Sequence, residues 1–95
     1  MVKMDQQTAE SIAIAGLARL AGDEDLLLRF SALSGILPND IRDAAGQPGF
    51  LVGVLDFYLA HEPDLLDWTG SDQLNPESIM LARHALSPID MQGFE

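Results

Sequence analysis

Apolar side chains recur along this chain at the spacing of helices rather than strands. In the first twenty residues they fall three and four positions apart, which places them on one face of a helix. No segment alternates apolar with polar residues for long, and no Asn-Gly or Asp-Gly hairpin pair occurs. The pattern predicts an all-α fold. The first helical stripe comprises Ala9, Ile12, Ala13, Gly16, Leu17 and Leu20.

Turn and capping residues divide the chain into six helical segments. Asp23 and Asn75 are suited to cap helices, and Pro38 and Pro76 are suited to the first helical position. Leu37 is a poor cap before Pro38. We expect Leu26, Leu27, Phe30 and Leu33 to be buried in the second helix, and Leu65, Leu66 and Trp68 in the fifth. The segments cover about residues 6–21, 24–34, 38–45, 49–61, 63–70 and 76–87.

The second half of the chain repeats the first at a shift of 38 residues. Phe30 then falls on Trp68 and Pro38 on Pro76, and several leucines and alanines coincide as well. A period of this length is typical of a small helical unit. Residues 50–59 are apolar almost all round, as in a helix enclosed by its neighbours. The sequence therefore predicts a compact bundle of five or six short helices, in two similar halves around this central helix.

The length of 95 residues indicates a single helical domain over residues 1–95, and we expect residues 1–5 and 88–95 to be flexible. The longest apolar run is far shorter than the roughly 20 residues of a membrane-spanning helix, and the start does not have the pattern of a signal peptide. We therefore expect a soluble protein without a membrane partner, in the cytoplasm. The absence of cysteine excludes disulfides and thiolate sites.

The formal net charge of −10 is unevenly distributed. Residues 1–42 contain four Lys or Arg against six Asp or Glu, whereas residues 43–95 contain one against nine. Such a field repels nucleic-acid phosphates and speeds the encounter with a basic partner. An acidic surface also serves solubility alone, so the charge by itself does not establish a partner.

Candidate catalytic and metal-binding residues do not form a complete set. His61 and Glu62 begin like a zinc-protease helix, but Leu65 occupies the position of the second histidine. Asp64 and Asp67 share one helix face, where a solvated pair is a simpler interpretation than acid–base catalysis. We expect no metal, no cofactor and no catalytic residue, which favours a non-enzymatic protein and leaves an enzyme as the alternative.

Residues 30–45 have the layout of a helix-turn-helix. The helix that would contact DNA carries Asp40 and Asp43 against Arg42, so it is negative where DNA contact needs positive charge. We therefore expect no nucleic-acid partner.

A small non-enzymatic interaction module fits these observations best. We expect it to bind a basic protein partner through its acidic second half, or to self-associate through an apolar patch. The alternative is a small-molecule carrier or enzyme with a pocket near Tyr58, His61 and Trp68. Core packing accounts for Tyr58 and Trp68 equally well. The expected partner surface comprises Tyr58, His61, Asp64, Asp67, Trp68 and Asp72.

One motif at the junction of the two halves supports a family resemblance. Residues 46–51 have the sequence Gly-Gln-Pro-Gly-Phe-Leu, and the flanking segments 33–42 and 54–59 share the likeness. In these stretches the chain resembles a family of short alphaproteobacterial proteins of unknown function, over about residues 9–86. The resemblance implies a compact bacterial helical protein and transfers no activity, cofactor or catalytic residue.

Overall fold

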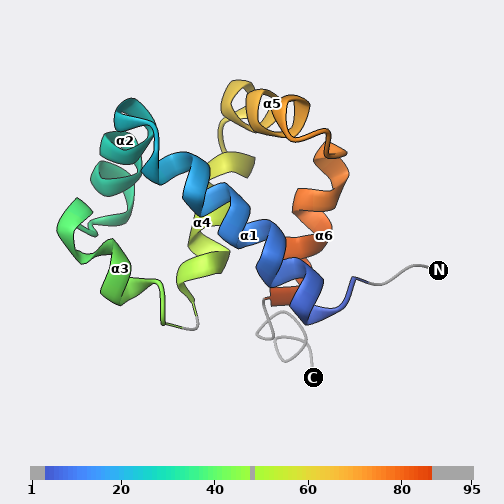
Figure 1. Ribbon diagram of the computed structural model, residues 1–95, viewed down its shortest axis with the longest axis horizontal. Helices are drawn as coiled ribbons and strands as arrows, with labels where there is room; N and C mark the ends of the chain where they lie inside the picture. Colours follow the sequence, from blue (N-terminus) through green and yellow to red (C-terminus); the bar gives the residue numbers. More distant parts are fainter. Residues whose placement is uncertain (1–3, 48, 87–95) are drawn as a thin grey trace.

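Capping side chains determine where two of the helices begin. Asp23 accepts hydrogen bonds from the backbone N–H groups of Asp25 and Leu26, and Asn75 accepts one from Glu77. The computed structural model describes residues 4–47 and 49–86, and every regular element in those two ranges is helical (Figure 1). The elements are α1 (Gln6–Ala21), α2 (Glu24–Ser34), the 3₁₀ turn η1 (Pro38–Asp40), α3 (Ile41–Ala44), α4 (Phe50–Leu59), α5 (Glu62–Ser71) and α6 (Pro76–Leu86).

The third predicted segment is weaker than the others. It divides into η1 and the four-residue helix α3, and Leu37 makes no side-chain capping hydrogen bond. A missing cap and a short length leave few hydrogen bonds to hold a regular helix. The poor cap predicted from the sequence is thus confirmed.

Two helices rather than one form the centre of the fold. α4 packs on α1 and α6, and it also contacts α2 and α5. α1 crosses in front of α4 and packs closely against α6 as well (Figure 1). The central position predicted for residues 50–59 is confirmed, and α1 shares it. The buried stripe of α1 contains Ala9, Ala13, Gly16 and Leu20, as the sequence pattern indicated.

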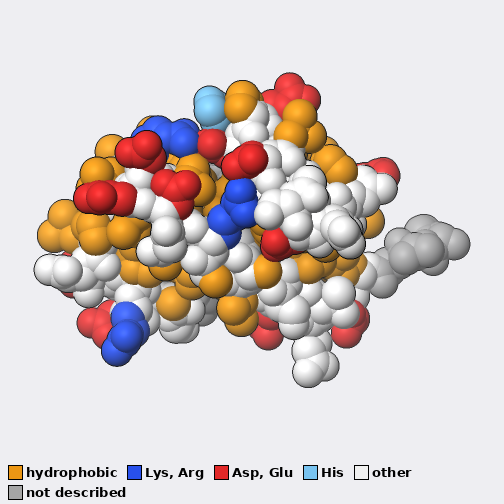
Figure 2. Space-filling view, turned by 45° about the horizontal axis from the view of Figure 1, so that its top comes forward, with side chains coloured by type: hydrophobic (Ala, Val, Ile, Leu, Met, Phe, Trp, Pro, Cys, Tyr) orange, Lys and Arg blue, Asp and Glu red, His pale blue; other side chains and the backbone are white. Residues whose placement is uncertain are grey.

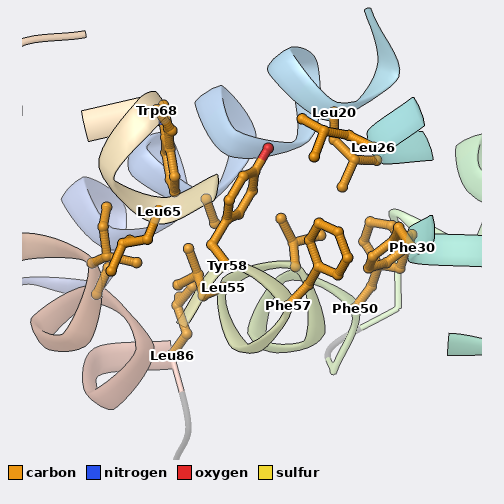
Figure 3. Packing of buried hydrophobic residues seen from close by; sticks show 14 of the residues in the cluster. Leu20, Leu26, Phe30, Phe50, Leu55, Phe57, Tyr58, Leu65, Trp68 and Leu86 are labelled. Carbon is orange, nitrogen blue, oxygen red and sulfur yellow. The ribbon is translucent and has the colours of Figure 1, made fainter. Parts of the chain in front are cut away.

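Aromatic rings fill the core between α2, α4 and α5 (Figure 3). Phe30 makes edge-to-face contacts with Phe50 and Phe57, at centroid distances of 5.8 and 5.5 Å. Tyr58 lies 4.6 Å from Trp68 between ring centroids. Burying rings of this size stabilises a small domain by about 1.5–3 kcal/mol each.

The two halves of the repeated sequence have the same fold in their second helices, α2 and α5. α2 begins at Glu24 and α5 at Glu62, its partner at a shift of 38 residues. Phe30 and Trp68 are the corresponding buried aromatics. The predicted ends, residues 1–5 and 88–95, lie outside the described part of the chain, apart from Met4, which packs against the core, and Asp5.

Two leucines expected in the core are on the surface. Leu33 is 77% exposed, and Leu66 is 49% exposed. α2 is buried along Leu26 and Phe30, so Leu33 in its last turn extends past the core. In α5 the buried face runs through Leu65, Trp68 and Thr69, and Leu66 is turned away from it.

Candidate functional site

Tyr58 and Trp68, two members of the predicted partner surface, are core residues. Both side chains are fully buried. The Tyr58 hydroxyl donates a hydrogen bond of 2.8 Å to the backbone carbonyl of Gly16 in α1, and burial raises the pKa of Tyr58 above its ordinary value. Neither ring offers atoms to a partner, so the predicted surface is corrected at these two positions. The two rings pack against each other in the core, with their centroids 4.6 Å apart (Figure 3).

Asp64 is held by two neighbouring groups. Arg29 of α2 donates two hydrogen bonds to its carboxylate, at 2.7 and 3.0 Å, and His61 Nδ1 lies 2.7 Å from Asp64 Oδ2. The Arg29 guanidinium, and after it His61, holds the pKa of Asp64 below its ordinary range, although burial acts in the opposite direction. Only 15% of the Asp64 side chain is exposed. Asp64 therefore joins α5 to α2, which the sequence did not indicate.

The other two acidic residues of the predicted surface also have partners within the chain. Asp67 forms a 2.8 Å ion pair with Arg19 of α1, and Asp72 accepts a 2.9 Å hydrogen bond from the Trp68 indole. Figure 2 shows basic side chains lying between acidic ones on this face. Cations from the first half thus neutralise part of the acidic second half. That His61, Asp64, Asp67 and Asp72 meet a basic partner stays a prediction.

A groove lined mainly by apolar groups lies between α2 and α4, and we call it the α2–α4 groove. Its volume is about 350 Å³, and buried Phe30, Phe50 and Phe57 contribute to its lining. Exposed Leu33 stands at its edge. Gly53 of α4 also lines it, and a Cβ built on Gly53 meets no atom within 4 Å. Hydrophobic side chains gather at the end of the molecule formed by α2 and α3 (Figures 1 and 2).

Carboxylates border the α2–α4 groove. Asp56 is part of its lining and forms a 2.8 Å ion pair with Arg83 of α6. Ile36 is shared with an adjoining shallow hollow, whose lining includes exposed Asp40 and Asp43. An apolar groove with one carboxylate in its lining thus lies between α2 and α4, and it adjoins a hollow with two more.

The sequence contained one signal for this groove. Gly49 and Gly53 stand four residues apart at the start of an apolar helix, so they fall on the same face. Because glycine has no side chain, this pair leaves one stretch of the helix face without side chains, although its neighbours are large. The exposure of Leu33 had no such signal, because its spacing from Phe30 fits a buried stripe.

Comparison with protein families identifies the chain. A family model described as a protein of unknown function, DUF3572, matches residues 6–89. The match covers most of the chain, which therefore belongs to this family. Searches of curated proteins and of solved structures found no match. Among the described residues, no helix is long and apolar enough to cross a membrane.

Proposed function

We propose that this protein is a small non-enzymatic interaction module that binds a basic protein partner through the α2–α4 groove. The observation that carries the proposal is the exposed Leu33 beside a hollow floored by three buried phenylalanine rings. Exposed apolar surface that continues into a hollow marks interaction sites more often than isolated exposed leucines do. The partner is expected to be a protein of the bacterial cytoplasm.

The shape of the groove suits one helix or loop of a partner. A hollow of about 350 Å³ accommodates an apolar side chain such as Leu or Phe, with room for part of its backbone. Gly53 lets that backbone approach α4 closely, because no side chain projects there. The rings of Phe30, Phe50 and Phe57 are fixed by their edge-to-face contacts, so little conformational entropy is lost on binding.

Charge favours a basic partner. The chain carries a formal net charge of −10. Asp56 lines the groove, and Asp40 and Asp43 line the hollow that adjoins it at Ile36. Complementary charge raises the rate of encounter and sets orientation, while the apolar floor supplies most of the affinity. A partner segment with one apolar anchor flanked by Lys or Arg meets both requirements.

A comparison of two leucine variants tests this proposal. Leu33→Asp places a charge at the groove, and Leu66→Asp places the same charge on an exposed leucine of α5 outside it. We expect wild type and Leu66→Asp to capture the same basic protein from lysate of the source cell, and Leu33→Asp to lose at least tenfold in affinity for that protein once purified. Capture of no protein, or equal loss with both variants, contradicts the proposal.

Sedimentation of the same three proteins separates a partner from a second copy. A monomeric wild type is expected. A dimer that Leu33→Asp dissociates and Leu66→Asp does not would show that the groove serves self-association instead.

A further inference from the structure

A second hollow lies between α1 and the segment formed by η1 and α3, and we call it the α1–α3 hollow. Its volume is about 710 Å³. Ile14, Leu17 and Ala18 contribute from α1, Ile41 contributes from α3, and Arg42 and Asp43 supply charged groups. Small-molecule sites have this character, since they measure roughly 300–1,000 Å³ and combine apolar walls with a few polar groups.

The sequence repeat explains why this hollow exists. In the second half the equivalent surfaces belong to α4 and α6, which pack directly on one another, and Leu55 and Ile79 are fully buried there. Their counterparts in the first half are Leu17 and Ile41. Leu17 is only partly buried, and Ile14 beside it is 54% exposed.

The difference in packing follows from the difference in helix length. α6 continues for 11 residues, whereas α3 ends after 4 at Ala44. The first half therefore leaves open an interface that the second half closes.

Arg42 gives the hollow a specific chemical preference. Arg19, Arg29 and Arg83 each form an ion pair with an aspartate. In residues 4–47 and 49–86, Arg42 is the arginine without such a pair, and it lines the hollow. A guanidinium binds a carboxylate through two parallel hydrogen bonds.

We propose that the α1–α3 hollow binds a small amphipathic anion, an apolar chain that ends in a carboxylate. The chain lies along Ile14 and Leu17 and reaches buried Ile41, so that it covers the exposed Ile14 side chain and the exposed part of Leu17. The carboxylate binds the Arg42 guanidinium at the margin. This site is separate from the α2–α4 groove and does not depend on the function proposed for that groove.

Three probes with the same eight-carbon chain test the site: octanoate, 1-octanol and octylammonium. Amide chemical shifts of the ¹⁵N-labelled full chain are followed during each titration, at concentrations below the micellar range. The net charge of −10 favours the cation over the whole surface. Tighter binding of octanoate, with shifts at residues 14–18 and 41–45, is therefore expected only if Arg42 holds the head group. Absence of shifts in these two segments, or octylammonium binding as tightly as octanoate, overturns the proposal.

Two variants and one matched control localise the binding. Arg42→Gln should weaken octanoate about tenfold and leave 1-octanol unchanged. Ala18→Phe fills the hollow from an exposed position on α1 and should abolish binding of both. Ala32→Phe adds the same ring to an exposed position of α2 that does not line the hollow, and it should bind both as wild type does. An Arg42→Gln protein that keeps full octanoate affinity contradicts the assignment, as does an Ala18→Phe protein that binds normally.

Discussion

The indole ring of Trp68 lies directly against Gly16. A Cβ built on Gly16 would come within 2.8 Å of the Trp68 Cη2 atom. The carbonyl of the same glycine accepts the hydrogen bond from Tyr58. Two buried aromatic side chains, Tyr58 of α4 and Trp68 of α5, thus contact α1 at Gly16. A side chain at position 16 would push the Trp68 ring away from α1.

Gly16→Ala should therefore destabilise the protein by about 1–3 kcal/mol, because the added methyl group overpacks a ring that is fully buried in the core. Gly53→Ala is the matched control. It also removes a glycine from a helix, but the new methyl group meets open space, so it should stabilise by about 0.5–1 kcal/mol. Urea unfolding of both variants measures the difference. Equal effects of the two substitutions would show that Trp68 does not lie on Gly16.

Tyr58→Phe should lower the free energy of unfolding by about 1–2 kcal/mol. The ring and its packing are retained, but the Gly16 carbonyl loses the hydroxyl donor that lies 2.8 Å away in a buried site. Thermal or urea unfolding measures the loss. A variant as stable as wild type would mean that the buried hydrogen bond is not formed in solution.

Asp64 should make the free energy of unfolding depend on pH in the acid range. Arg29 and His61 lower the folded-state pKa of Asp64 from its ordinary value of 3.8, so the unfolded chain takes up this proton first. The stabilisation is complete above the unfolded pKa and is lost as pH falls through the lower folded pKa.

Asp64→Asn should cost about 1–2 kcal/mol near neutral pH, because it removes a charged partner from the two hydrogen bonds of Arg29. Urea unfolding at pH 7 and at about pH 3 should show this cost shrinking toward the lower pH, because the unfolded chain takes up the Asp64 proton there. Asp67→Asn is a control on the same helix, since 77% of the Asp67 side chain is exposed and its pair with Arg19 should contribute under 1 kcal/mol. An Asp64→Asn cost that does not change with pH would contradict the predicted link.

Leu33→Asp should leave stability almost unchanged, within about 0.5 kcal/mol, because Leu33 is 77% exposed. Trp68→Asp should unfold the protein, since it places an unpaired carboxylate where the ring is fully buried. Circular dichroism at room temperature distinguishes the two variants. A Leu33→Asp protein that unfolds would indicate that the last turn of α2 is part of the core.

Local patterns were sufficient to predict the helices and most of the core. The caps at Asp23 and Asn75 and the repeat of Phe30 at Trp68 depend on residues close in sequence, so they could be found without coordinates. The ion pairs could not, because Arg29 and Asp64 are 35 residues apart. The sequence showed an acidic second half, but it did not show that Arg19 and Arg29 fold over it.

The candidate surfaces depend still more on tertiary structure. The spacing of Leu33 fits a buried stripe. Leu33 is exposed because the last turn of α2 extends beyond the core. The sequence is compatible with Tyr58 on the surface or in the core, and its burial depends on the position of Gly16 on a different helix. The two hollows arise where helices diverge, which depends on helix lengths and packing rather than on any single motif.

The proposed anion site depends on one difference between the halves, namely that α6 packs on α4 while α3 leaves an open hollow against α1. Amide hydrogen exchange measures this most directly, because amides in weakly packed elements exchange through low-energy local opening. We predict that residues 41–44 of α3 exchange at least a hundredfold faster than the equivalent residues 79–82 of α6. Equal protection of the two segments would show that the first half is closed like the second and would contradict the account.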